Sequence, residues 1–244
     1  MRGRAALVAL SLCVALVSGC GDNGTVVIPP PSPDTVRVSF QDGVLPAAGY
    51  QGTANAMLKD GPNNALRNGN FGAAQSDTLG AVLLSGALYE HRLIVRMNLT
   101  SIKSCSQVLA ANLSFHVIGP SSDAMTIEAH RVVLASYLDW IEGSGGVATG
   151  VSWTTIDGGV PWTAAGGDFE STVLASASFT GDTTVTFPLS TTLVKAWILM
   201  PASNDGVVIK TTDVSRERYA IVPMRENSVS GWRPRLDITY IKGP

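Results

Sequence analysis

Short runs in which apolar and polar residues alternate recur along most of this 244-residue chain. Between positions 109 and 117, every odd-numbered residue is apolar, whereas Asn112, Ser114 and His116 are polar. Successive side chains of a strand point to opposite faces, so a period of two predicts strands with one buried face and one solvated face. Such strands are typical of antiparallel sheets, and the pattern therefore predicts an all-β chain.

Further runs of this kind complete the prediction. Strands are expected at 35–40, 93–99, 109–117, 125–134, 171–179, 183–187, 206–211, 218–222 and 236–241, although Ile94 breaks the alternation of the second run. Clusters of Gly, Asn, Asp and Pro separate the runs, as turns require. About ten short strands at near-regular spacing predict an antiparallel β-sandwich of the jelly-roll type.

One segment is predicted to be helical. Apolar residues recur at helical spacing through 189–197, Ser190 or Thr191 can cap the N-terminus, and Pro201 lies beyond the end. We expect a helix of one to two turns that closes an end of the sandwich. The segment 140–169 is long, rich in glycine and irregular, and such loops often carry function.

The first 20 residues predict export. Arg2 and Arg4 precede an apolar run at 5–17. This run is shorter than the roughly 20 residues of a membrane-spanning helix, but it fits a secretory signal. The sequence Leu-Val-Ser-Gly-Cys at 16–20 resembles the bacterial lipobox, which implies cleavage before Cys20 and acylation of its thiol and amine. The alternative is an ordinary secreted protein in which Cys20 is incidental.

These features divide the chain into three parts. Residues 1–19 are the expected signal peptide, 20–34 the lipidated cysteine with its tether, and 35–244 a single β-sandwich domain. The proline-rich stretch 29–33 favours an extended spacer, although such segments also serve as peptide ligands. Because Gly21 rather than an aspartate follows Cys20, we expect the outer membrane or the cell surface.

Charge and cysteine content exclude further classes. The chain has 17 basic and 19 acidic residues, and two of the basic ones, Arg2 and Arg4, lie in the leader. A mildly acidic mature chain without a basic run argues against a nucleic-acid partner. Cys13 and Cys20 belong to the leader and the anchor, so no disulfide within the domain is expected, and Cys105 is expected to be buried or half-buried in a loop.

An ordered set of segments resembles the DNRLRE-domain family. The stretch LIVRMNLTSI at 93–102 resembles the family's LIRFDLSSI strand, with Met97 and Asn98 in place of the usual Phe-Asp and, further upstream, Asn55 where the family often has Asp. Other resembling segments are 139–143, 150–153, 161–169, 193–197, 204–206, 215–217 and 233–240. The resemblance spans about 35–241 and implies a jelly-roll sandwich of secreted and surface proteins. Such domains often accompany polysaccharide-active enzymes, and some bind acidic glycans such as alginate.

Binding of a carbohydrate would use aromatic side chains and, for an acidic glycan, basic side chains. Trp140, Trp153 and Trp162 lie together in the irregular loop and could stack on sugar faces. They could instead pack the loop onto the sheet edge, which is the interpretation that we favour. An acidic glycan would also need guanidinium or ammonium groups, and Arg216 and Arg218 are the first candidates. Further candidates are Arg92, Arg96, Arg131 and Lys210. Solvated strand faces explain these residues equally well, and Arg216 could pair with Glu217.

Metal binding and catalysis receive little support. Calcium could use Asp60, Asn63, Asn64, Asn68 and Asn70, or Asp157 with Asp168, but turn chemistry explains these residues better. The histidines, His91, His116 and His130, are too isolated for zinc. No nucleophile elbow is present, and Glu128, Glu142 and Glu170 are too scattered to form a glycosidase pair. We therefore expect no enzymatic activity and no required cofactor.

The sequence thus predicts a lipid-anchored, non-catalytic surface module that binds polysaccharide. The alternative is a structural or adhesive envelope lipoprotein that contacts a protein partner and no sugar. Exposed, coplanar tryptophan rings would favour the first function, and buried rings would favour the second.

Overall fold

The computed structural model describes residues 34–120 and 123–243, so the signal peptide, Cys20 and all of the tether before Asp34 lie outside the described residues. The described part belongs to one compact unit. Its strands are β1 (Thr35–Gln41), β2 (Thr53–Lys59), β3 (Gly69–Asn70), β4 (Ser76–Leu84), β5 (Ala87–Met97), β6 (Gln107–Ile118), β7 (Met125–Val132), β8 (Gly146–Val147), β9 (Phe169–Phe179), β10 (Asp182–Pro188), β11 (Val207–Thr211), β12 (Arg218–Pro223) and β13 (Arg235–Ile241).

Helical structure is sparse. The short helices are α1 (Asn64–Arg67) and α2 (Thr191–Leu199), with 3-10 turns η1 (Pro201–Ser203) and η2 (Ser230–Trp232). The α2 helix begins at the expected cap, where the Ser190 side chain accepts a hydrogen bond from the Leu193 backbone N–H, and Pro201 lies beyond its end. At nine residues it is slightly longer than expected. None of the described helices is both long and apolar enough to cross a bilayer.

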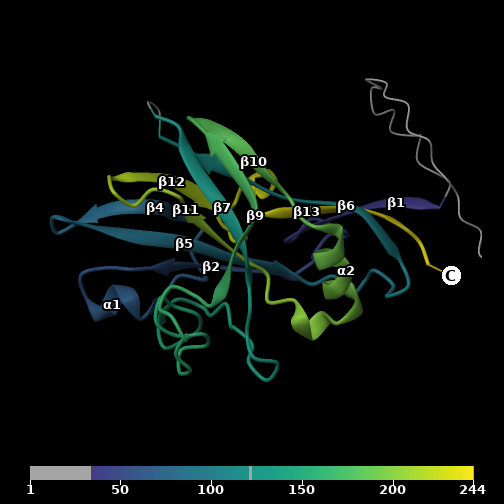
Figure 1. Ribbon diagram of the computed structural model, residues 1–244, viewed down its shortest axis with the longest axis horizontal. Helices are drawn as coiled ribbons and strands as arrows, with labels where there is room; N and C mark the ends of the chain where they lie inside the picture. Colours follow the sequence, from purple (N-terminus) through teal and green to yellow (C-terminus); the bar gives the residue numbers. More distant parts are fainter. Residues whose placement is uncertain (1–33, 121–122, 244) are drawn as a thin grey trace, which may run out of the picture. The chain divides into compact units, whose positions relative to one another are not determined.

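Eleven of the described strands form one continuous antiparallel sheet that folds into two layers (Figure 1). The path runs β1-β13-β6-β12-β4-β5-β11-β7-β9, with β10 beside β6 and β2 beside β5. One layer contains β1, β13, β6 and β10, the other contains β2, β5, β11, β7 and β9, and β4 and β12 connect them. The predicted all-β, antiparallel sandwich with one short capped helix is confirmed.

A common core fills the space between the layers. Phe40 of β1, Leu93 of β5, Phe115 of β6 and Val185 of β10 pack in it, and α2 adds Trp197. Each strand contributes alternate residues, which is the reason that the period of two in the sequence located these strands. All nine predicted runs correspond to strands.

Two of the longer strands, β2 and β4, were not predicted, because apolar and polar residues do not alternate regularly in their sequences. In β2, Ala56, Met57 and Leu58 are consecutive and all buried, because both faces of this strand are covered. In β4, Gly80 interrupts the pattern at a φ of +129°, and a Cβ there would lie 2.4 Å from the Arg218 carbonyl oxygen. An apolar run without alternation does not distinguish a buried strand from other buried structure.

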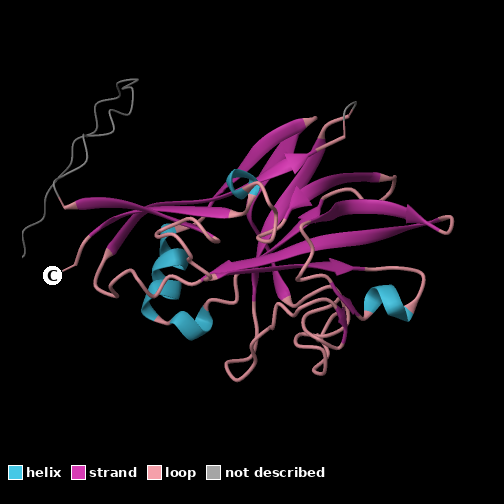
Figure 2. Ribbon diagram, turned by 180° about the vertical axis from the view of Figure 1, so that it is seen from behind, coloured by secondary structure: helices cyan, strands magenta, loops and turns pink. Residues whose placement is uncertain are grey.

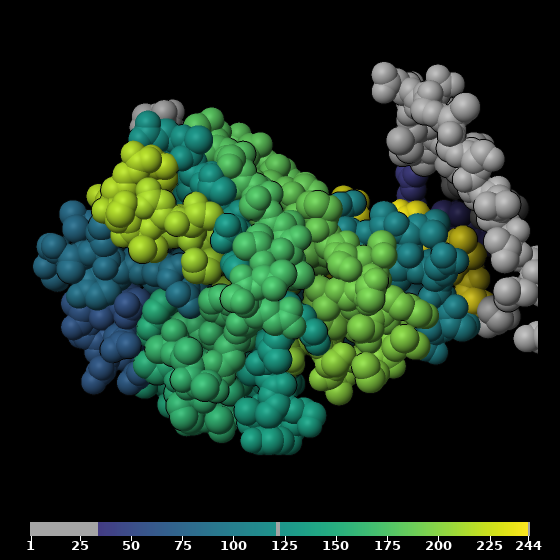
Figure 3. Space-filling model, viewed as in Figure 1, coloured from purple at the N-terminus to yellow at the C-terminus, as the bar shows by residue number. Residues whose placement is uncertain are grey.

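The irregular segment 133–168 covers the outer face of the second layer. Figure 2 shows loops beside the strands here, and in Figure 3 the teal-to-green atoms of this segment lie on the surface next to those of β9. Beneath it lies a second apolar cluster that includes Ile94 of β5 and Val208 of β11. The strands β2, β5 and β11 are therefore buried on both faces where the loop covers them, and Ile94 breaks the alternation because its side chain enters this second cluster.

Candidate functional site

The three loop tryptophans are buried. Trp140, Trp153 and Trp162 are 0%, 6% and 5% exposed and pack against Ala56 and Ile94 in the second cluster. Two of the indole N–H groups donate to backbone carbonyls, that of Trp140 to Asp205 at 2.9 Å and that of Trp162 to Ser152 at 2.9 Å. These rings therefore form no exposed stacking platform, and they attach the loop to the sheet.

Arg216 and Arg218, the first basic candidates, form ion pairs with acidic side chains. Arg216 and Arg218 lie near the start of β12 and both contact Asp123, at 3.1 and 2.9 Å. Arg216 also pairs with Asp213, whereas Glu217 accepts a hydrogen bond from the Leu83 backbone, so the alternative Arg216–Glu217 pair does not form.

The remaining basic candidates lie on or beside the second layer. Arg131 pairs with Glu170, and Arg92 and Lys210 both pair with Glu90. The guanidinium of Arg92 also lies over the Trp153 ring, 4.8 Å from its centroid. Each of these charges is thus compensated within the fold.

The oxygen-rich segments hold the fold together internally. Asn63 caps α1, Asp60 pairs with Arg67, and Asn70 donates to the carbonyls of Glu142 and Val151. Asp168 accepts from the backbone N–H groups of Thr163 and Ala164, and Asp157 from those of Gly159 and Val160. Across residues 34–120 and 123–243, no group of three or more His, Cys, Asp or Glu side chains could hold a metal ion.

The histidines and the cysteine occupy separate places. His91 is buried against Thr78, at 2.7 Å from its hydroxyl, and burial lowers the pKa of His91 to about 4. His130 lies 3.5 Å from Glu128, and His116 stacks on Trp232. Cys105 is exposed, so the expectation of a buried or half-buried thiol is wrong. It lies in the connection between β5 and β6, and such connections usually run over the surface.

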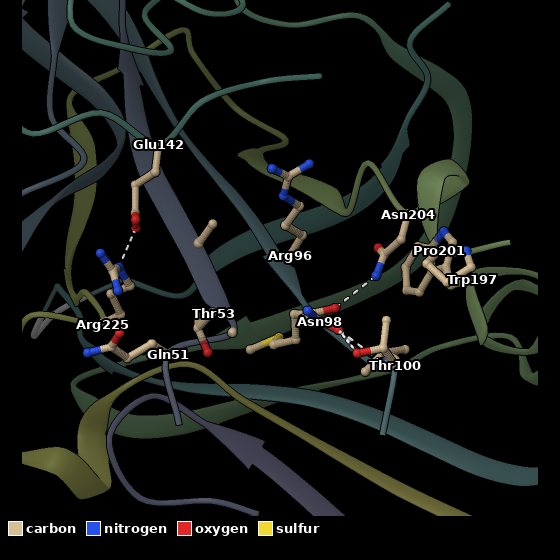
Figure 4. Close-up of a pocket in the computed structure, with 14 residues that line it drawn as sticks. Gln51, Thr53, Arg96, Asn98, Thr100, Glu142, Trp197, Pro201, Asn204 and Arg225 are labelled. Atoms are coloured by element: carbon tan, nitrogen blue, oxygen red, sulfur yellow. Dashed lines mark hydrogen bonds and ion pairs between the residues drawn. The ribbon is translucent and has the colours of Figure 1, made fainter. Parts of the chain in front are cut away.

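The most developed polar site is a cleft of about 500 Å³ at the end of β5 (Figure 4). Its walls come from the start of β2, the residues after β5, the end of α2 with η1, and two loops. In Figure 4, Glu142 and Arg225 lie at one end and Asn98, Thr100, Asn204 and Trp197 at the other, with Arg96 between them. Gln51 and Thr53 complete the polar lining.

Two asparagines shape one end of the cleft. The Asn98 side-chain oxygen accepts from the backbone N–H and the hydroxyl of Thr100, at 2.9 and 2.7 Å. Asn98 is exposed, and its amide nitrogen is thus the part of the group that is left for a ligand. Asn204 donates from Nδ2 to the Met97 carbonyl at 2.8 Å. Gly206 permits the turn that follows, since its φ is +80° and a Cβ would lie 2.2 Å from the Val95 carbonyl oxygen.

Carboxylates hold both arginines of the cleft. Arg96 forms a two-pronged pair with Asp139, donates to the Trp140 carbonyl at 3.0 Å, and lies over the Trp140 ring. Arg225 contacts Glu142 at 2.6 Å and Glu226 at 2.8 Å. The guanidinium charges are therefore balanced, and the cleft does not present an uncompensated positive charge.

Glu142 connects three segments of the chain. Its Oε1 accepts from the Asn55 backbone N–H at 2.8 Å and from Arg225 Nε at 2.6 Å. Burial raises the pKa of Glu142 to about 7, and this effect outweighs the hydrogen bond from Asn55 and the attraction of Arg225. A carboxyl with a perturbed pKa in a cleft is a common mark of a functional site.

The floor of the cleft is polar as well. Among the described residues, the side-chain oxygens of Thr53 and Asn204 and the indole nitrogen of Trp197 are buried without a hydrogen-bond partner. Thr53 itself is only 2% exposed. Most buried polar groups in proteins are paired. Ten further unpaired side-chain atoms lie elsewhere among the described residues, so these three add to the polar character of the lining but do not by themselves mark a binding site.

Comparison with known proteins identifies no relative from which the role of this cleft could be transferred. No protein-family model matches the chain, and no curated protein matches it. Sequence reasoning named none of the cleft's amide or hydroxyl side chains as ligand-binding. Asn98, Glu142, Trp197 and Asn204 come from four separate segments of the chain and all line this cleft, so no local pattern in the sequence connects them.

Proposed function

We propose that this chain is a membrane-anchored, non-catalytic module that binds polysaccharide in the cleft at the end of β5. The observation that carries the proposal is the lining of that cleft, in which the amides of Gln51 and Asn98 and the hydroxyl of Thr100 are exposed and the side-chain oxygens of Thr53 and Asn204 lie buried. Sugar hydroxyls both donate and accept, and amide and hydroxyl side chains do the same. A cleft of this size and lining can therefore bind a few sugar units.

The charge balance favours an uncharged polysaccharide. An acidic glycan would have to compete with Asp139 for Arg96 and with Glu142 and Glu226 for Arg225. Breaking an existing ion pair removes much of the gain from the new one. The resemblance to a family with acidic-glycan binders makes alginate a necessary comparison ligand.

The lining also favours binding over catalysis. Glu142 is the one carboxyl group among the described residues that line the cleft, and Asn55 and Arg225 already hold it. Common glycosidases place two carboxyl groups on opposite sides of the scissile bond. A binding module needs no such pair.

The leader supports the anchoring part of the proposal. The positive n-region, the apolar run and the lipobox occur in order and support export and anchoring, and Gly21 after Cys20 favours the outer membrane or the cell surface. Metabolic labelling with palmitate should acylate the full chain but not its Cys20→Ser variant, which should leave the membrane fraction. Equal labelling of both chains would overturn the lipoprotein assignment.

A glycan array that contains neutral and acidic polymers tests the ligand, with the full-length chain in detergent at low and physiological salt. We expect binding to a neutral glycan that changes little with salt, because no net charge is neutralised. Asn98→Asp keeps the acceptor that holds Thr100 but removes the amide donor, and it should weaken binding. Gln107→Glu, which adds the same charge on the exposed start of β6, should not.

The buried loop tryptophans support a second function, a structural or adhesive module that contacts envelope proteins. In that function the cleft would contribute nothing to binding. Absence of binding to every glycan on the array would overturn the polysaccharide proposal and leave this alternative. Binding only to alginate, with a steep salt dependence, would replace the neutral ligand by an acidic one.

A further inference from the structure

Trp232 differs from every other tryptophan of the chain. The other four are at most 6% exposed, whereas Trp232 is 38% exposed. Exposing a large aromatic ring forgoes the favourable free energy of burying it. Trp232 lies outside the cleft, and sequence reasoning did not select it.

The ring is held in a fixed position. Its plane stacks on His116 of β6, with the centroids 4.7 Å apart and an angle of 13° between the planes. The loop that carries it is fixed on both sides, because Arg233 donates to the carbonyls of Asn227 and Asp42, at 2.8 and 2.9 Å, and Asn227 donates to the Gln75 carbonyl at 3.0 Å. Binding to such a ring costs little conformational entropy.

The neighbouring sheet surface is rich in hydroxyl groups. His116 lies opposite Thr184 of β10, and Ser114 lies opposite Thr186. Residues directly opposite each other in an antiparallel pair share one face of the sheet. Both threonines are exposed, so their hydroxyl groups lie on the same face of the sheet as His116, on its β10 side.

We propose that Trp232, supported by His116, is a second sugar-binding site, which stacks on the apolar face of a pyranose unit of an uncharged polysaccharide. A pyranose ring has an apolar C–H face for the indole and hydroxyl groups at its edge for the threonines. The proposal rests on the proposed function for its ligand class, but it uses a different surface and a different kind of contact. It supplies the exposed aromatic ring that the cleft lacks.

The test separates the two sites by affinity electrophoresis of the full-length chain. Gels contain a soluble β-glucan, xylan, mannan or alginate, and the variants are Trp232→Ala, Trp232→Phe and Asn98→Asp. We expect Trp232→Ala to bind a neutral polymer roughly tenfold more weakly, and Trp232→Phe to keep most of the affinity, because a stacking ring remains. Bound polymer should also protect the fluorescence of the parent chain from acrylamide, and this protection should be lost in Trp232→Ala.

Each outcome decides the proposal. A loss in Trp232→Ala without a loss in Asn98→Asp would support this site and overturn the cleft, and the reverse would overturn this site alone. Equal losses in Trp232→Ala and Trp232→Phe would show that stacking is not the contact. Binding to no polymer would overturn both sites, and a shift of Trp232→Ala in urea unfolding by as much as a core variant would assign the ring to stability instead.

Discussion

The two apolar clusters of this protein are built in different ways. The core between the sheet layers takes alternate side chains, mostly aliphatic and phenylalanine, from strands of both layers, and α2 adds Trp197. The outer cluster combines the opposite faces of β2, β5 and β11 with three tryptophans from the irregular loop. Strand periodicity therefore determines the first core, whereas the second depends on how a loop without periodicity folds back over the sheet.

The tryptophans of the outer cluster also make polar contacts. At the edge of the outer cluster, the guanidinium groups of Arg92 and Arg96 lie over the rings of Trp153 and Trp140, at 4.8 and 4.5 Å from the centroids. Two indole N–H groups in the same cluster bond to backbone carbonyls. The loop is thus attached by directional contacts, and we expect its attachment to be lost without unfolding of the sandwich.

The largest effect is expected in the core between the layers. Phe115 is fully buried and stacks on Phe187 at 5.9 Å, so Phe115→Ala should lower the free energy of unfolding by about 3–5 kcal/mol. Urea-induced unfolding measures the change. Leu109→Ala, at an exposed position of the same strand, is the control and should change it by less than about 0.5 kcal/mol. Leu109 is exposed because the pairing of β6 with β13 is irregular at this point, and similar losses in both variants would contradict that exposure.

Trp140→Ala should affect the loop more than the sandwich. It leaves a cavity in the outer cluster and removes the bond to the Asp205 carbonyl, at a cost of about 2–4 kcal/mol. Hydrogen exchange should show lost protection at 141–162 while the amides of β6 and β13 stay protected. Uniform loss over both regions would mean that the two clusters unfold as one unit.

Ile94→Thr tests whether the outer face of β5 is buried. The change would restore the alternation of the sequence, yet we expect a loss of about 2 kcal/mol, because it buries a hydroxyl in an apolar cluster. Val173→Thr, on the exposed face of β9, should be nearly neutral in the same urea titration. A neutral Ile94→Thr would show that the loop does not cover this position in solution.

The smallest effect concerns Glu142, which joins the loop to β2 and to Arg225. Its pKa is raised from 4.5 to about 7 by burial, so the folded state holds a proton that the unfolded state has released between these values. Stability from this group is therefore present at low pH and is lost as the pH rises from about 5 to about 8, by about 1 kcal/mol after allowance for solvent screening.

Glu142→Gln should remove this dependence. His91 has the opposite effect on the pH dependence of stability. Its pKa is lowered to about 4, so its contribution to the free energy of unfolding is lost as the pH falls below about 6.5. Because His91 is present in both chains, the quantity to measure is the difference in unfolding free energy between the parent chain and Glu142→Gln at each pH. A difference that does not vary from pH 5 to 8 would contradict the raised pKa.

The sequence alone determined the all-β class, nine of the strands, and a short capped helix around 189–197, which the structure places at Thr191–Leu199. It could do so because a strand with one buried face must alternate, and because Ser190 and Pro201 mark helix boundaries wherever the helix packs. The export signal with Cys20 stays a prediction from the same kind of local pattern.

Tertiary structure decided which aromatic side chains are buried and which polar side chains share a cleft. Only the fold shows that Trp140, Trp153 and Trp162 are buried while Trp232 is exposed, since burial depends on what a distant segment covers. It also decided that Gln51, Asn98, Glu142, Asn204 and Arg225 share a cleft, because side chains this far apart in the chain meet only through strand pairing and loop packing. Local propensity records what one residue prefers, whereas a binding site depends on which residues the complete fold brings together.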